Sequence, residues 1–399
     1  MTFQNFERLK VEQYNNYNQY GAYGFRILFI PSPLSIYYVN SSTISELTAN
    51  VDSSERLNIY NSFKGRTLFA EKSGGFKDFS GIMLLLGSLL VLYVGYEAFI
   101  HKDYLRFMSG FVDYKKFFFS IVLSRVFNFI LLFLLNAAVA MILLKINGIK
   151  FSDHEYSHFA IYLGILVLMM VFFFAAGTIA GSFKSSFAGF VTLIISWFVL
   201  VFLVPGIVNT ITARKSDNIA STYNLELQKL TNIMDFEKHA LKKVGATTEN
   251  NIESVKKLIE KYWNKEFKQI QSLEKKLENE MEKNIRHFQN LSLIFPSTFY
   301  LSAGNEISSK GYENFILFFG YIQTLKEKFV RFYIDHRYYS DTPLDKPTNV
   351  ESFIKGNENL FNAKSRLPKS FFQGVLLILV YIIGLLAVSY FRFIKSLRL

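Results

Sequence analysis

The stretch FSGIMLLLGSLLVLYVGYEAFI, residues 79–100, decides the fold of this chain. Glu97, close to its end, is the one charged side chain in it. The hydrocarbon core of a bilayer takes about 20 consecutive apolar residues of α-helix, which is the length of this stretch. Residues 79–100 therefore predict a membrane-spanning helix.

Runs of similar length and character recur along the chain, at about 118–146, 158–181, 186–208 and 370–392. The 399 residues are 50% hydrophobic and 19% charged, with 43 Phe and 23 Tyr. A single run of this kind would also suit the buried core helix of a soluble domain, but five in one chain indicate a polytopic membrane protein. The predicted fold class is an all-α membrane protein with five transmembrane helices.

Basic residues in the short loops predict the orientation of the spans. If the spans alternate in direction, the loop after the first span, the hairpin between the third and fourth spans, and the C-terminal tail share one side. These segments carry Lys102, Arg106, Lys115, Lys116, Lys184, Arg392, Lys395 and Arg398. We expect that side to be the cytoplasm, with the spans in the cell (inner) membrane and the C-terminus cytoplasmic.

This topology predicts four regions. Residues 1–78 form an extracytoplasmic segment, and 79–208 form a four-helix transmembrane region whose cytoplasmic loop covers 101–117. Residues 209–369 form an extracytoplasmic helical domain, and 370–399 form the last span and a cytoplasmic tail.

The N-terminal region poses a topological problem, because it is expected outside but contains no run that could span a bilayer. Its most apolar part, YGFRILFIPSPLSIYYV, is interrupted by Arg26, Pro31 and Pro33. We expect a sixth, N-terminal membrane helix to be missing from the chain. Translocation of the segment by the first span, acting as a reverse anchor, is the alternative.

The extracytoplasmic segment 209–369 shows helical periodicity in three places. From Ile252 to Ile285 apolar residues recur at three-four spacing between lysines and glutamates, and similar patterns cover about 219–245 and 310–336. The three helices are expected to pack as an antiparallel bundle. An intermolecular coiled coil is the alternative. Pro296 is predicted to break the long helix, and Ala303-Gly304 to allow a close approach or a turn.

Composition bears on other classes of partner. The net charge of +12 is spread over the membrane flanks and one helical segment, without a compact basic stripe, so nucleic acid is not an expected partner. The chain has no cysteine, which excludes disulfides and thiolate metal sites.

His154, Glu155 and His158 form an H-E-x-x-H pattern, which on a helix is typical of zinc proteases. A hydrolytic zinc site needs a third ligand and an open position for water. The residues after His158 are apolar, and the next acidic residue, Asp217, lies beyond two spans. The sequence favours a polar helix start capped by Ser152 or Asp153. We expect no metal, no cofactor and no catalytic residue.

The cytoplasmic loop is the most informative segment. In YEAFIHKDYLRFMSGFVDYKKFFFSIVLSR, residues 96–125, apolar positions such as Leu105 alternate with Lys102, Asp103 and Arg106. Such a short amphipathic segment suits contact with a soluble motor. An interfacial helix that only anchors the chain is the alternative.

Three stretches resemble the transmembrane subunit of type-2 ABC transporters, in the branch with a large extracytoplasmic domain before the last helix. These are QYGAYGFR (Gln19 to Arg26), the segment from Glu97 to Arg125, and FPSTFYLSAGNEIS with Phe315 and FVRFY. The middle stretch looks like the family's ATPase-coupling region, although FIHKDY replaces the usual acidic-Arg-acidic-x-Gly-Thr part, and only Leu105 and Arg106 carry over plainly. The family also normally begins with a membrane helix.

The resemblance implies the permease of an ATP-driven exporter, in which two permease copies pair with two cytoplasmic ATPase subunits. The coupling loop would involve Glu97, Lys102, Asp103, Leu105 and Arg106. The rival interpretations are a membrane scaffold or sensor with an extracytoplasmic partner-binding domain, and a membrane zinc protease.

Few polar residues fall inside the predicted spans. Arg125 is expected to reach toward the cytoplasmic surface, and Asn128 and Asn136 to hydrogen-bond across helices. A substrate path along this second span is the alternative role for them.

Overall fold

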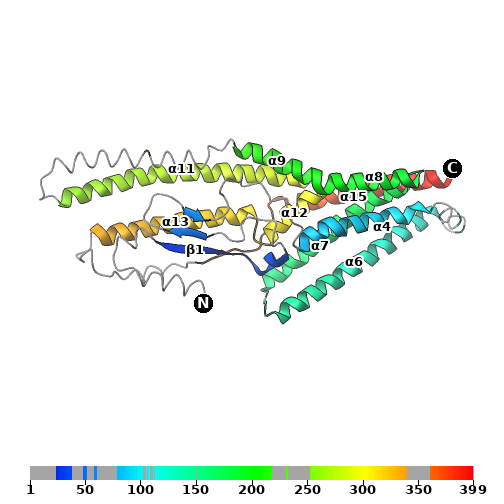
Figure 1. Cartoon of the computed structure of the whole chain (residues 1–399), viewed down its shortest axis with the longest axis horizontal. Coiled ribbons are helices and arrows are strands. Elements are labelled where there is room, and N and C mark those ends of the chain that lie inside the picture. The colour runs from blue at the N-terminus through cyan, green and yellow to red at the C-terminus, as the bar shows by residue number, and fades with distance from the viewer. Residues whose placement is uncertain are drawn as a thin grey trace.

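The computed structural model describes residues 24–37, 48–51, 58–60, 79–101, 105, 107, 111, 113–149, 151–217, 231, 252–338 and 360–398. The chain is mostly helical and elongated, with the apolar helices gathered toward one end and the long polar helices toward the other (Figure 1).

Five described helices are long and apolar enough to cross a membrane: Phe79–Ile100, Tyr114–Ile146, Asp153–Gly181, Ser186–Val208 and Phe371–Lys395. The prediction of a multi-pass membrane protein is confirmed at this level. The second, third and fifth spans are the helices α6 (Tyr114–Ile146), α7 (Asp153–Gly181) and α15 (Phe371–Arg398). The first consists of α3 (Phe79–Ile82), the π-helical turn η3 (Met83–Gly87) and α4 (Ser88–Ile100); the fourth begins with α8 (Ser186–Phe198), the π-helical turn η4 (Val199–Leu203) and α9 (Val204–Asp217).

Glycines allow α4 and α7 to cross at backbone contact. A Cβ atom added at Gly95 would overlap the Phe174 carbonyl, and one added at Gly177 would overlap the Leu92 carbonyl. Gly181, one turn beyond Gly177, meets α4 in the same way. Small residues at four-residue spacing let membrane helices approach closely, so that dispersion contacts between main chains hold them together. This crossing is the centre of the membrane region.

Polar contacts are made at each of the two π-helical turns. Trp197 Nε1 donates to the Leu85 carbonyl of η3 at 3.3 Å and to Ser88 Oγ at 3.2 Å. In η4 the carbonyl of Leu200 would accept from residue 205 in the five-residue pattern of a π-helix, but Pro205 has no N–H. The Ser297 hydroxyl donates to this Leu200 carbonyl instead, at 2.6 Å. Hydrogen bonds therefore link the fourth span to the first span, through Trp197, and to the polar region, through Ser297.

Three helices dominate the polar end: α11 (Ile252–Ile294), α12 (Pro296–Ile307) and α13 (Tyr312–Tyr338). The long helix from Ile252 and the helix over 310–336 are confirmed, as is the break at Pro296, which begins α12. The expected helix over 219–245 lies outside the described residues, apart from Thr231. Ala303-Gly304, predicted to allow a close approach or a turn, does not form a turn: both residues are buried within α12, and the chain turns instead at Ser309, where φ is 63°.

A four-stranded sheet is the main departure from the predicted all-α fold. Its strand order is β3 (Asn58–Tyr60), β2 (Thr48–Val51), β1 (Phe25–Ile30) and β4 (Leu360–Asn362). The strands β1 and β4 are parallel, with Leu28 opposite Leu360, although they come from opposite ends of the chain. Phe25 and Phe29 are buried and make edge-on ring contacts with Phe329 and Phe318 of α13. The polar end is therefore a mixed region in which α13 covers the sheet.

Candidate functional site

The end of the membrane region where the predicted coupling loop lies is held together by aromatic rings. Phe118 of α6 contacts Phe99 of α4 with ring centroids 5.2 Å apart, and Phe393 of α15 at 5.6 Å. Phe99 and Phe393 are also in contact, at 5.4 Å. Stacked and edge-on aromatic pairs stabilise beyond their buried area. Three spans are therefore fixed to one another at the end next to the loop.

The described part of the loop presents one buried and two exposed apolar side chains. Leu105 is buried in the core of the chain itself and its N–H donates to the His101 carbonyl at 3.0 Å. Phe107 and Phe111 are 65% and 74% exposed, and their rings meet edge-on at 5.3 Å. Leu105 therefore anchors the loop, and Phe107 and Phe111 form its outward surface. The predicted Lys102, Asp103 and Arg106 lie outside the described residues.

Charged groups lie at the same end of the membrane region. Glu97, predicted for the loop, pairs with Arg125, predicted for the membrane interior, at 3.8 Å, and both side chains are partly exposed. Arg392 of the tail lies over the Phe183 ring of the third-to-fourth hairpin at 4.9 Å. Among the described residues, the exposed lysines and arginines at this end include Lys115, Lys116, Lys184, Arg392 and Lys395. The ends of α4 and α6 that flank the loop, the hairpin between α7 and α8, and the end of α15 thus lie together, as the alternating topology requires, and Figure 1 shows these helix ends toward the end marked by the C-terminus.

The two intramembrane asparagines both lie on the exposed side of α6. Asn136 Nδ2 donates to the Leu132 carbonyl of its own helix at 2.9 Å. Asn128 has no hydrogen-bond partner in the part of the chain that the structure describes. Within the described part of the chain, neither asparagine makes the predicted hydrogen bond across helices.

The H-E-x-x-H pattern opens α7 and is used for capping. Ser152 is the N-cap, and its Oγ accepts from the Glu155 N–H while the Glu155 carboxylate accepts from the Ser152 N–H at 2.7 Å. The predicted capping by Ser152 is confirmed. The rings of His154 and His158 are 4.1 Å apart, and His158 Nδ1 lies 2.8 Å from the His154 carbonyl. Among the described residues, no group of three His, Cys, Asp or Glu could hold a metal ion.

The junction between the membrane region and the polar region is a second candidate site, which sequence reasoning missed. The Ser32 hydroxyl donates to Glu155 Oε1 at 2.9 Å and lies 3.1 Å from the Ser365 hydroxyl. The Ser32 N–H donates to Ser309 Oγ at 2.6 Å. Ser32, Ser309 and Ser365 are all buried. Ser32 thus links its own segment to three distant segments of the chain. In the sequence the junction corresponds only to scattered serine residues, and these form no local pattern that would predict it.

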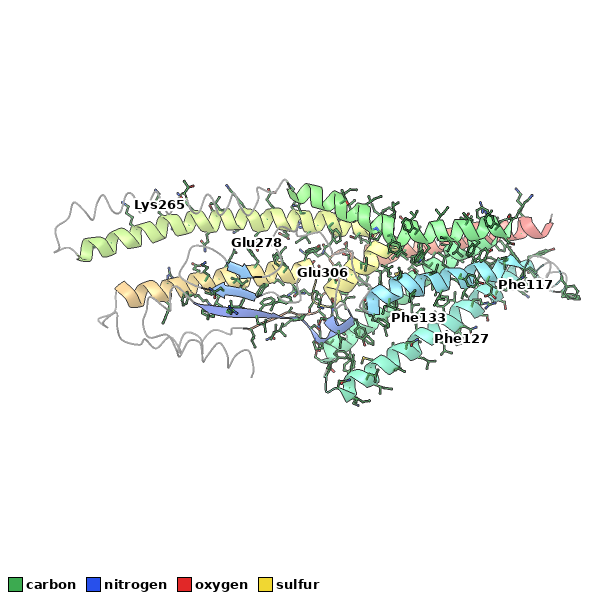
Figure 2. All side chains as sticks on the ribbon, viewed as in Figure 1. Phe117, Phe127, Phe133, Lys265, Glu278 and Glu306 are labelled. Atoms are coloured by element: carbon green, nitrogen blue, oxygen red, sulfur yellow. The ribbon has the colours of Figure 1, made fainter. Side chains whose placement is uncertain are left out.

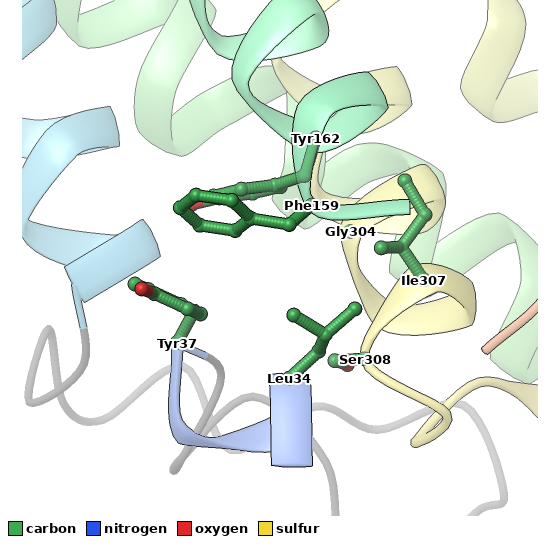
Figure 3. A pocket seen from close by; sticks show the side chains of 7 residues that line it. All are labelled: Leu34, Tyr37, Phe159, Tyr162, Gly304, Ile307 and Ser308. Atoms are coloured by element: carbon green, nitrogen blue, oxygen red, sulfur yellow. The ribbon is translucent and has the colours of Figure 1, made fainter. Parts of the chain in front are cut away.

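A small cavity lies at the same junction, between the 3-10 helix η1 (Pro33–Tyr37), α7 and α12 (Figure 3). Its lining is mainly apolar, and it has room for about one water molecule. Tyr37 is buried beside Phe159 and Tyr162, and its hydroxyl has no hydrogen-bond partner among the described residues. Burial raises the pKa of Tyr37 to about 12. The cavity is too small to be a substrate site.

Glu306, near the C-terminal end of α12, is the most unusual charged residue of the junction (Figure 2). It is 2% exposed, and its carboxyl group packs against Gly311, where a Cβ atom would overlap it. Oε1 accepts from the Glu313 N–H at 3.3 Å, and Oε2 has no hydrogen-bond partner in the described part of the chain. Burial, with Glu313 nearby, raises the pKa of Glu306 to about 8 in spite of the backbone N–H groups and Arg366.

Comparisons of the chain with protein-family models, with curated proteins and with solved structures find no match.

Proposed function

We propose that the chain is the transmembrane permease subunit of an ATP-driven exporter of the type-2 ABC class, working with a separate cytoplasmic ATPase subunit. The observation that carries the proposal is the loop at the inner end. It exposes an aromatic pair, Phe107 and Phe111, close in sequence to the exposed Lys115 and Lys116, and its Leu105 is buried in the same core cluster as the rings around Phe118 that join three spans. The family resemblance of the segment from Glu97 to Arg125 supports the same assignment.

A loop with these properties can transmit force. The chain has no phosphate-binding loop of the Walker A type, so nucleotide must act through a partner. A partner that moves Phe107 and Phe111 moves the inner ends of α4, α6 and α15 together, because the aromatic cluster joins them. The close crossing at Gly177 passes the motion from α4 to α7. Since energetic coupling between two sites is reciprocal, substrate binding should in turn change ATPase activity.

The proposed assembly contains two permease copies and two ATPase subunits in the inner membrane. The loop, the hairpin and the C-terminal tail face the cytoplasm, because their exposed lysines obey the positive-inside rule there. The region of α11, α13 and the sheet then lies on the extracytoplasmic side. The buried junction around Ser32 is the connection between that region and the spans.

Affinity purification of the full chain from native membranes tests the proposal. The wild-type chain is expected to bring down a protein with a Walker A motif, and the double variant Phe107→Ala/Phe111→Ala to lose it. Phe372→Ala is the matched control, since Phe372 is 79% exposed at the other end of the membrane region. Removal of the two loop rings leaves the fold intact because neither is buried. A wild-type chain that brings down no ATPase would favour the membrane scaffold or sensor instead.

The zinc-protease interpretation has its own test. Glu155, which would have to act as the general base, instead caps α7 and accepts the Ser32 hydroxyl. Metal analysis is expected to find no stoichiometric zinc in the purified wild-type chain, and therefore no loss of zinc in a His158→Ala variant. Such zinc would restore the protease as a candidate.

A further inference from the structure

The span α6 stands apart from the other spans. In Figure 1 it diverges from α4 and α7 toward the outer side, and its large apolar residues are exposed along most of its length. Among the described residues, one side of α6 is buried against the chain, through Phe118, Val122, Phe129, Ala137 and Leu144. The opposite side of α6 has no partner in the part of the chain that the structure describes.

The centre of this exposed side has the spacing of a helix–helix seam. Residues at alternating intervals of four and three are all exposed: Ser124, Asn128, Leu131, Leu135, Ala138 and Ile142. This is the a/d pattern by which two helices pack as a left-handed pair. At 1.5 Å per residue the seam rises about 27 Å, close to the roughly 30 Å thickness of the hydrocarbon core.

Asn128 shows that lipid alone does not suit this seam. Its carboxamide lies near the middle of α6, is exposed, and has no hydrogen-bond partner among the described residues. Lipid chains offer none, and an unsatisfied polar group in hydrocarbon costs several kcal/mol. Asn136 differs, because it lies at the border of the seam and bonds to its own helix. The large exposed residues near the middle of α8 and α15, such as Ile194 and Ile383, are apolar.

We propose that this seam of α6 packs against the same seam of a second copy of the chain, with Asn128 meeting Asn128 of that copy. A carboxamide both donates and accepts, so it is complementary to itself. Around a twofold axis along the membrane normal, equivalent residues of two parallel helices face one another. An asparagine in such a seam also sets the register of the pair. The inference gives the contact surface of the permease pair and rests on the proposed function only for the existence of that pair.

The absence of cysteine from the chain makes cross-linking a direct test. A disulfide forms where Cα atoms lie about 4.4–6.8 Å apart, so a single introduced cysteine links two copies only near the twofold axis. Ala138→Cys and Ala137→Cys are a matched pair, since the two alanines are neighbours and only Ala138 lies in the seam. Under mild oxidation of native membranes, Ala138→Cys and Leu135→Cys are expected to give a covalent dimer, and Ala137→Cys none.

The role of Asn128 is tested by the strength of association. In a fluorescence energy-transfer titration in vesicles, Asn128→Leu is expected to weaken the dimer about 3- to 30-fold, the range that intramembrane hydrogen bonds support. Asn136→Leu is the control and should change association less than twofold. Equal cross-linking at 137 and 138, or none at either, would overturn the proposal. A product of another mass would assign the seam to a different protein. None of these results depends on ATPase binding, so the two proposals can fail separately.

Discussion

The buried carboxyl group of Glu306 predicts how the stability of this protein depends on pH. Substitution by glutamine keeps the shape of the side chain but removes the ionisable proton. The groups that face Glu306 are Glu313, which opposes its ionisation, and Arg366 and the backbone N–H groups at the start of α13, which favour it. Burial outweighs the favourable groups, because a carboxylate loses its hydration in the interior.

The sign and size follow from the pKa of about 8 in the folded chain against 4.5 for an exposed glutamate. Below pH 4.5 both states hold the proton and the stability is unaffected. Between pH 4.5 and 8 the unfolded chain loses the proton while the folded chain keeps it, so stability falls as pH rises. A difference of about 3.5 pKa units corresponds to about 5 kcal/mol. Above pH 8 the loss is complete.

Thermal unfolding of the detergent-solubilised protein between pH 5 and 9 measures this effect. The two tryptophans provide an intrinsic fluorescence signal. The part of this loss that falls between pH 5 and 9 is about 4 kcal/mol, and, if the whole chain unfolds together, it corresponds to a fall of roughly 5 °C in Tm for the wild type relative to Glu306→Gln. Other titrating groups are common to both proteins and cancel. Parallel pH profiles would refute the reasoning and mean that Glu306 is already ionised in the folded state.

Three further substitutions test the packing, each by thermal unfolding. Gly177→Ala should lower the free energy of unfolding by about 1–3 kcal/mol, because the added Cβ would overlap a backbone carbonyl of α4. Gly164→Ala on the same helix, where there is open space, should be neutral or stabilising. Equal effects of the two substitutions would contradict the close crossing. Ser297→Ala should cost about 1–3 kcal/mol by leaving a carbonyl of η4 unpaired, and Thr192→Ala, whose hydroxyl bonds within its own helix, should cost less. Glu155→Ala should cost about 1 kcal/mol through the loss of the capping box, and an unchanged Tm would show that Glu155 contributes nothing to the cap.

The sequence by itself determined the elements whose signals are local. The length of the apolar runs predicted the spans, with ends within a few residues of those observed for Phe79–Ile100 and Ser186–Val208. Three-four periodicity predicted α11 and α13, and the residue types around Glu155 predicted the cap of α7. The length of an apolar run and the periodicity of an amphipathic helix are properties of consecutive residues. A single stretch of sequence is therefore enough to predict the helix.

The tertiary structure alone decided which distant residues meet. The sheet pairs Leu28 with Leu360, and the buried hydroxyls of Ser32 and Ser365 lie together across 333 residues of chain. In the sequence Glu306 resembles any polar residue of an amphipathic helix, and only the tertiary structure packs Gly311 against its carboxyl group. Likewise, no local pattern distinguishes the inward Leu105 from an outward one. These positions depend on contacts that form only after the helices pack, when each residue's surroundings come from remote parts of the chain.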